Sequence, residues 1–101
     1  MHWEELLPGL WRFWNDPVDG IGSHSYFIQH RMGNVIFEGA TAYSKEALEF
    51  MDTLGGVHLA SSSHPHTYGA LWQLQDYFDA NIALHVADFD WSGSLRVTHP
   101  F

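Results

Sequence analysis

The length of the chain allows one small domain, and its charge excludes several classes of partner. The 101 residues carry four Lys or Arg against twelve Asp or Glu, a formal net charge of −8, so the basic footprint that a nucleic acid or an anionic membrane requires is missing. The absence of cysteine removes disulfides and thiolate metal ligands. No stretch approaches the roughly 18 apolar residues of a membrane-spanning helix, and Glu4 and Glu5 make the start too acidic for a signal peptide. We therefore expect a soluble, cytoplasmic protein.

Three β-strands are predicted in the first part of the chain. Residues 10–14 are aromatic and are followed by the turn-forming residues 15–17. A turn over residues 30–34 is predicted to join a strand over 26–28 to a strand over 35–37. These segments together predict a β-meander.

From residue 44 the apolar spacing changes to that of a helix. Ser44 can cap this helix at its start, and Gly55-Gly56 can end it. The inward face of the helix is predicted to carry Ala47, Phe50, Met51 and Leu54.

The remaining segments alternate between strand and helix. A buried strand over 57–60 and a polar loop over 61–66 are followed by a helix over 68–78, a strand over 82–86 and a weaker strand over 95–98. The residues of this second helix that are predicted to face inward are Leu71, Leu74 and Phe78. The order βββ-α-β-α-β(β) is that of an α/β protein whose site lies beyond the strand ends.

A pair of histidines in the predicted polar loop is the strongest candidate for chemistry. His64 and His66 stand in the sequence Ser-His-Pro-His-Thr-Tyr, and two His one residue apart in an extended loop project to the same side. Both imidazoles can then reach one metal ion at about 2.0–2.1 Å, with Pro65 restricting the backbone between them. A chain with eight His also acquires such pairs by chance, as solvated loop residues.

Nearly the whole chain resembles the metallo-β-lactamase-fold superfamily. Residues 9–11 are similar to the opening strand of that family, 23–28 to its next strand, and 35–39 to a strand that ends in a D-x-G type turn. Residues 54–60 resemble the segment that leads into the metal loop, and 78–88 resemble the strand and turn that follow the loop helix. The motif Ser-His-Pro-His, residues 63–66, resembles that of a divergent branch of metallo-hydrolase-like proteins.

The resemblance implies a fold and a site. The fold is α/β: a single domain over 1–101, equivalent to the amino-terminal half of an αββα sandwich, with a mixed sheet made of a β-meander followed by α-β-α-β. The metal loop of the family reads H-x-H-x-D-H, in which the first two His hold one zinc ion, and the Asp and the last His hold a second. His64 and His66 match the first two positions, whereas Tyr68 and Gly69 stand where the Asp and the last His should be. A bridged pair of zinc ions is therefore not expected.

A shifted register of the same motif is also open. It places Ser61 and Ser63 at the first two positions, and Pro65 and His66 at the Asp-His positions. We prefer the first register because it retains a usable pair of ligands, whereas the shifted one retains a single ligand.

Four residues are candidates for the surroundings of the metal. Glu38 stands near the strand-end acid of the family, although such a carboxylate also serves as a turn or cap acceptor. Tyr68 follows the histidine pair, and His85 and Asp88 lie at a predicted strand end and in the turn after it. A hydrogen-bonded structural role is favoured for His85, and a solvated turn for Asp88.

In full members of the family, a second half supplies the third zinc ligand and covers the inner face of the sheet. Two His are one protein ligand short of a catalytic zinc site. The resemblance thus implies a truncated or divergent relative of zinc-dependent hydrolases with partial zinc binding and little activity as a lone chain.

Two alternatives stay open. In the first, a dimer partner or a missing second half completes a zinc-dependent hydrolase that acts on a small-molecule substrate. In the second, the chain is a non-catalytic interaction module. All three hypotheses expect a homo-oligomer, or another chain, to cover the exposed sheet face, with no nucleic acid and no membrane as partner.

Overall fold

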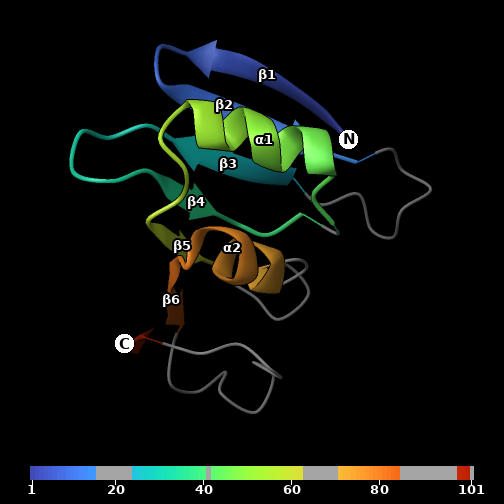
Figure 1. The fold of residues 1–101 in the computed structure, drawn as a ribbon. Coiled ribbons are helices and arrows are strands. Elements are labelled where there is room, and N and C mark those ends of the chain that lie inside the picture. Colours follow the sequence, from blue (N-terminus) through green and yellow to red (C-terminus); the bar gives the residue numbers. More distant parts are fainter. Residues whose placement is uncertain (16–23, 41, 63–70, 85–97, 101) are drawn as a thin grey trace.

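A computed structural model describes residues 1–15, 24–40, 42–62, 71–84 and 98–100, which form one mixed sheet with two helices on one side (Figure 1). The strands of these residues are β1 (His2–Leu7), β2 (Leu10–Trp14), β3 (His24–Ile28), β4 (Val35–Phe37), β5 (Leu59–Ser61), β6 (Asn81–Leu84) and β7 (His99–Pro100). The helices are α1 (Lys45–Thr53) and α2 (Leu71–Phe78). At nine and eight residues, both described helices are too short to cross a membrane.

The order of the strands in the sheet is their order in the sequence. Strands β1 to β4 pair antiparallel, and β4 to β7 pair parallel. The predicted α/β class, a meander followed by α-β-α-β, is confirmed.

Strand β1 was not predicted. It pairs with β2 through a hairpin at Pro8-Gly9, where Gly9 has a φ of 81°. Only Trp3 of β1 is half-buried, and the other five side chains are exposed. The strand therefore lacks the alternating apolar pattern by which strands are recognised, and the Pro-Gly pair was its one sequence signal.

Helix α1 begins and ends where the sequence predicts. The Ser44 Oγ accepts a hydrogen bond from the Ala47 N–H at 3.1 Å. At the other end, the Gly56 N–H donates to the Met51 carbonyl at 2.9 Å, and Gly56 has a φ of 76°. Ala47 and Met51 are buried as predicted, together with Leu48, which was not predicted.

The two other residues predicted for the inner face of α1 lie at its margin. Phe50 is half-buried, with its ring centroid 5.4 Å from that of Trp3 and 5.0 Å from that of Trp11. Leu54 is also half-buried.

Helix α2 confirms the prediction over its described part, and residues 68–70 lie outside the described residues. Leu71 and Leu74 are buried as predicted. Gln75 is buried beside them, whereas Phe78 is only half-buried.

The later strands are shifted from their predicted positions. The strand predicted over 57–60 lies at Leu59–Ser61, because the His58 N–H donates to the Asn34 carbonyl in a connection that precedes the ladder. Strand β6 begins one residue early, at Asn81, and residues 85 and 86 of the predicted strand lie outside the described residues. Of the strand predicted over 95–98, residues 95–97 also lie outside the described residues. The two-residue strand β7 follows Thr98.

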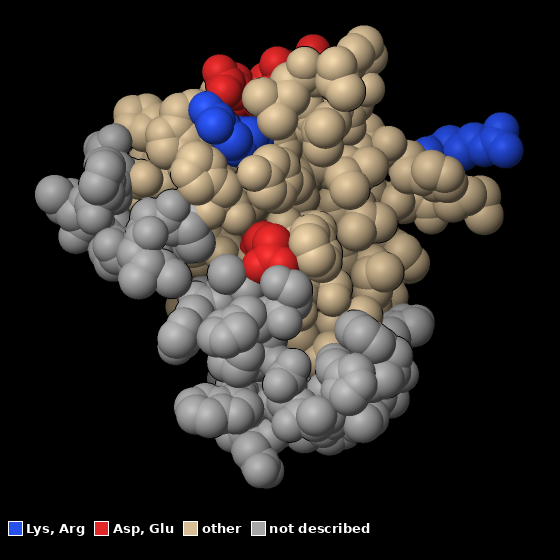
Figure 2. All heavy atoms as spheres, turned by 180° about the vertical axis from the view of Figure 1, so that it is seen from behind, with Lys and Arg blue, Asp and Glu red and all other residues tan. Residues whose placement is uncertain are grey.

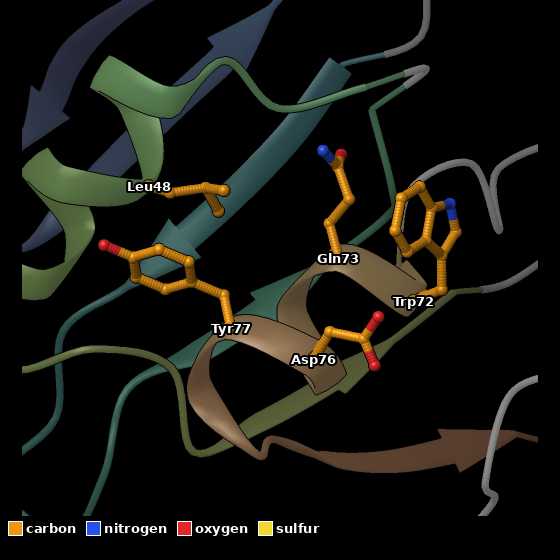
Figure 3. Close-up of a pocket in the computed structure, with 5 residues that line it drawn as sticks. All are labelled: Leu48, Trp72, Gln73, Asp76 and Tyr77. Atoms are coloured by element: carbon orange, nitrogen blue, oxygen red, sulfur yellow. The ribbon is translucent and has the colours of Figure 1, made fainter.

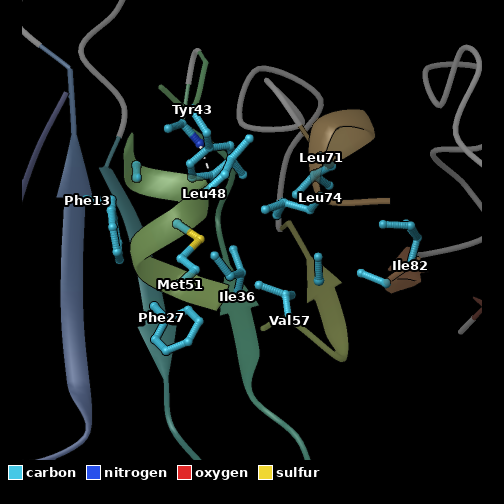
Figure 4. Close-up of a cluster of buried hydrophobic side chains, with 14 of the residues drawn as sticks. Phe13, Phe27, Ile36, Tyr43, Leu48, Met51, Val57, Leu71, Leu74 and Ile82 are labelled. Atoms are coloured by element: carbon cyan, nitrogen blue, oxygen red, sulfur yellow. Dashed lines mark hydrogen bonds between the residues drawn. The ribbon is translucent and has the colours of Figure 1, made fainter. Parts of the chain in front are cut away.

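The core lies between the sheet and the two helices (Figure 4). Its largest fully buried apolar side chains are Phe13, Phe27, Ile36, Met51, Leu71, Leu74, Ile82 and Leu84. Within this core the Ser25 Oγ and the Tyr43 hydroxyl form a hydrogen bond of 2.7 Å.

Candidate functional site

The carboxyl ends of three parallel strands meet at one edge of the sheet. Phe37 at the end of β4 pairs with Ser61, and Ser61 at the end of β5 pairs with Ala83 of β6. The Ser61 Oγ also donates a hydrogen bond of 2.6 Å to the Ala83 carbonyl. In open α/β sheets this edge is where ligands bind.

Glu38 and Ser62 lie together at this edge. The Glu38 N–H donates to the Ser61 carbonyl at 2.9 Å, and the Ser62 Oγ donates to Glu38 Oε2 at 3.4 Å. Glu38 has a φ of 68°, a conformation that is costly for a residue other than glycine and that clusters at functional sites. The sequence marked Glu38 as a candidate but not Ser62, whose only signal was its place in a run of serines after a predicted strand.

The predicted zinc ligands lie outside the described residues. His64, His66 and Tyr68 belong to segment 63–70, and His85 and Asp88 belong to segment 85–97. Each segment directly follows a described strand end in the chain, the first after Ser62 and the second after Leu84. The described residues contain no group of three or more His, Asp or Glu that could hold a metal ion.

The donor set of this chain does not fit a catalytic zinc ion. The preferred register supplies two imidazoles, and a catalytic zinc takes three protein ligands. Glu38, the acid at the strand edge, already accepts a hydrogen bond from Ser62. No hydrolytic step is therefore assigned to the lone chain.

Tyr43 anchors the loop between the strand edge and α1. Burial raises its pKa from 10.0 to about 12, and the hydrogen bonds with Ser25 and Ala40 oppose that rise. The Tyr43 N–H donates to Gln73 Oε1 at 2.7 Å, and Gln73 Nε2 donates to the Tyr43 carbonyl at 3.1 Å. This two-point contact ties α2 to the loop, and sequence reasoning missed it because a Gln on a helix has no distinctive pattern.

The face of the sheet opposite the helices is largely apolar. Residues on this face alternate along each strand with the buried ones. Its apolar members are Leu10, Trp14, Tyr26, Ile28, Val35, Phe37, Leu59 and Ala83, all half-buried or exposed, and Arg12 and His24 lie on the same face. Ile28 is 40% exposed and Phe37 is 44% exposed, and no other described element covers them. Figure 2 shows this side, where the charged atoms of the described part lie along the upper margin, in a basic side chain that protrudes at the right and in one acidic group near the middle.

One ion pair lies on this face. Arg12 forms an ion pair with Glu4 on the neighbouring strand, and its guanidinium lies 4.3 Å from the ring centroid of Trp14. Trp14 also stacks on His24, with the ring centroids 6.3 Å apart. A partner that packed on this side would therefore contact apolar surface and the Arg12–Glu4 ion pair, whose two charges cancel.

Comparison with known proteins finds a resemblance in sequence to one protein and in fold to metallo-β-lactamases. No protein-family model matches the sequence. The uncharacterized protein YmaE of Bacillus subtilis (strain 168) is 29% identical over 82 residues, which are 81% of this chain and 30% of that protein.

Two solved structures share the fold. One is a metallo-β-lactamase from Cronobacter sakazakii with a HARLDQ motif, and the other is a mutant of that motif. Their TM-scores are 0.67 and 0.68 at 16% identity, and the matches cover 89% of this chain but 37% and 36% of those chains. The chain therefore spans about a third of the length of these relatives, and it has the α/β half-sandwich of the metallo-β-lactamase fold.

Proposed function

We propose that this divergent metallo-β-lactamase-fold chain is a relative of zinc-dependent hydrolases that keeps a partial metal site and has little activity alone. The observation that carries the proposal is the meeting of three parallel strand ends at Glu38 and Ser62, directly before segment 63–70 in the chain. His64 and His66 are the ligands, and Glu38, Tyr68, His85 and Asp88 surround them. With a third protein ligand from a second layer, zinc held by His64 and His66 would lower the pKa of a bound water toward about 7 and would polarise the bond to be cleaved.

Metal content tests the proposal. Wild-type protein, purified without a chelator or a histidine tag and separated by size, is compared with His64→Ala/His66→Ala by elemental analysis. The matched control is His30→Ala, which removes an exposed imidazole in the β3–β4 turn. We expect zinc in the wild type and in the control, lost from both on dialysis against a competing chelator, and none in the double variant. Equal zinc in all three proteins, or none in the wild type, would contradict a metal site at His64 and His66.

A second role is favoured by the apolar sheet face. A sheet with apolar side chains on both faces is typical of one that is buried on both sides. We therefore propose that a second layer of polypeptide covers Ile28 and Phe37, either as a second copy of this chain or as another chain. Such a layer would either complete a hydrolase for a small-molecule substrate or make the chain a non-catalytic interaction module.

Sedimentation measurements test the second layer. The variant Ile28→Lys/Phe37→Lys charges the apolar face, and Met32→Lys, at a side chain that is 78% exposed in the β3–β4 turn, is the control. We expect the wild type and the control to associate, and the double variant to remain a folded monomer. A wild type that is monomeric at high concentration would contradict self-association, while the metal measurement would stand separately.

Activity separates the two versions of this role. A completed hydrolase would cleave a small ester with a rate per chain that rises with protein concentration and is lost in His64→Ala. An interaction module would associate equally in His64→Ala and in the presence of a chelator.

A further inference from the structure

A hollow of about 270 Å³ lies between the two helices, on the side of the molecule away from the apolar sheet face (Figure 3). Leu48 of α1 lines one side of it, and four side chains of α2 line the rest: Trp72, Gln73, Asp76 and Tyr77. The described residues of the sheet edge, Glu38 and Ser62, do not line this hollow.

The spacing of the α2 residues places them on two neighbouring stripes of the helix. Trp72 and Asp76 are four residues apart, as are Gln73 and Tyr77, so each pair is stacked along the helix surface. The stripe of Leu71, Leu74 and Gln75 already fills the core side of α2. The Tyr77 ring packs edge-on against Phe78, with centroids 4.7 Å apart, whereas Trp72 is 51% exposed and core packing does not account for it.

The floor of the hollow is held in place before any ligand arrives. Gln73 contacts the N–H and the carbonyl of Tyr43 at 2.7 and 3.1 Å, which holds its amide in one orientation. Leu48 is only 7% exposed and belongs to the core cluster. A ligand would thus meet an ordered apolar and amide surface, with little side-chain entropy to lose.

The charge around the hollow is negative. Asp76 is exposed and forms no ion pair among the described residues. The other acidic residues on or beside the two helices are Glu46, Glu49, Asp52 and Asp79. Lys45 is the one Lys or Arg of these helices, and it lies 3.8 Å from Glu49. A cation is therefore attracted to this side of the molecule, and an anion is repelled.

We infer that this hollow binds a small organic cation, an ammonium group attached to a compact apolar body. Figure 3 shows Trp72 and Asp76 on one side of Gln73, and Tyr77 and Leu48 on the other. The Trp72 ring attracts the ammonium group through its quadrupole, and the Asp76 carboxylate neutralises its charge. The Tyr77 ring lies toward the apolar body. The Leu48 side chain offers contact to the apolar body. The volume is close to the lower end of ligand pockets, which favours a single ring or a short alkyl group as that body.

Benzyltrimethylammonium is the probe that tests this inference, with benzyl alcohol as a neutral comparison and phenylacetate as an anionic one. The shifts of the tryptophan indole N–H signals are followed by NMR at low salt, and the signal of Trp72 is identified by its loss in Trp72→Leu. We expect a saturable shift of the Trp72 signal with the cation, at least about fivefold weaker binding of benzyl alcohol, and no binding of phenylacetate.

Two variants that each remove one negative charge distinguish binding in the hollow from attraction of the cation by the net charge of the chain. Asp76→Asn should weaken binding of the cation by about threefold or more, because it removes the carboxylate that lines the hollow. Asp52→Asn, at an exposed carboxylate of α1 that does not line the hollow, should leave the affinity unchanged.

Three results would overturn the inference. Equal affinity for benzyltrimethylammonium and benzyl alcohol would mean that the charge contributes nothing. Equal weakening by Asp76→Asn and Asp52→Asn would mean that only the net charge of the chain attracts the probe. A Trp72 signal that does not shift would mean that the hollow takes no such ligand. The proposed zinc site is unaffected by any of these results.

Discussion

Tyr43 is the residue whose surroundings most change its chemistry. Its hydroxyl lies 2.7 Å from the Ser25 Oγ and accepts a hydrogen bond from the Ala40 N–H, and the side chain is only 3% exposed. Such a buried hydroxyl strongly favours its neutral form. The sequence shows a Tyr before a helix cap, and nothing in that pattern predicts the pair with Ser25.

We predict that the stability of the fold falls at alkaline pH because of Tyr43. Its pKa is raised to about 12 in the folded chain, from 10.0, so between these values only the unfolded chain releases the proton. The stabilising contribution is complete below pH 10 and is lost as the pH rises toward 12, by roughly 2–3 kcal/mol. Urea unfolding across this range measures the loss. This loss of stability between pH 10 and 12 should be smaller in Tyr43→Phe and unchanged in the control Tyr77→Phe. The same pH dependence in both variants would contradict the role given to Tyr43.

Asn34 holds two segments together. Its Nδ2 donates to the carbonyls of Leu54 and Gly56, both at 2.9 Å, and its Oδ1 accepts from the His30 N–H at 3.0 Å. The side chain thus joins the β3–β4 turn to the end of α1. The sequence predicts a turn at Asn34 but could not show its contacts with Leu54 and Gly56, which are 20 and 22 residues away in the chain.

Asn34→Ala should therefore destabilise the fold by about 2–4 kcal/mol, because it leaves buried backbone groups without partners. Asn15→Ala is the matched control, since Asn15 donates one exposed hydrogen bond, to the Ala42 carbonyl. Its expected loss in the same urea unfolding experiment is below about 1 kcal/mol. Losses of similar size for the two variants would show that the three bonds of Asn34 add little.

Among the elements, those with strong local signals were predicted best. The limits of β2 and β4, the Ser44 cap and the glycine end of α1 follow from local chemistry, and the structure confirms them. Strand β1 depends on pairing with β2 across a hairpin, which its own exposed side chains do not indicate. Of the candidate site, the structure describes Glu38 alone, and the place of the histidine pair stays a prediction.

The cap of α1 gives a prediction at this scale. Ser44→Ala should destabilise the fold by about 1 kcal/mol in thermal or urea unfolding, because the Ala47 N–H loses its acceptor. Ser44→Asp should retain the stability, since its carboxylate caps the same N–H and favours the positive end of the helix dipole. A loss as large for Asp as for Ala would show that the cap is not the cause.

For the whole molecule, the main feature is the separation of its two sides. Among the described residues, the helix side carries the acidic residues Glu46, Glu49, Asp52 and Asp76, whereas the opposite sheet face is largely apolar and carries the Arg12–Glu4 ion pair. A partner that packed against the apolar face would bury Ile28 and Phe37, which are 40% and 44% exposed.

The salt dependence of self-association should show whether apolar contacts or ion pairs drive it. Each copy carries a net charge of −8, so two copies repel each other at long range, and salt screens that repulsion. We expect self-association measured by sedimentation to strengthen as sodium chloride rises from about 0.05 to 0.5 M, because the contact itself is apolar. Weaker association at high salt would indicate ion pairs between the copies instead.

The agreement between strand order and chain order has a consequence for how the protein folds. Every strand from β2 onward pairs with the strand made just before it, so no pairing has to wait for a distant part of the chain. The hairpin pairings β1–β2 and β3–β4 are local, whereas the parallel pairs β4–β5 and β5–β6 are joined through α1 and α2, and parallel pairings form more slowly. During synthesis, the sheet can still grow by one strand at a time as the chain leaves the ribosome, with β1 and β2 as its first hairpin.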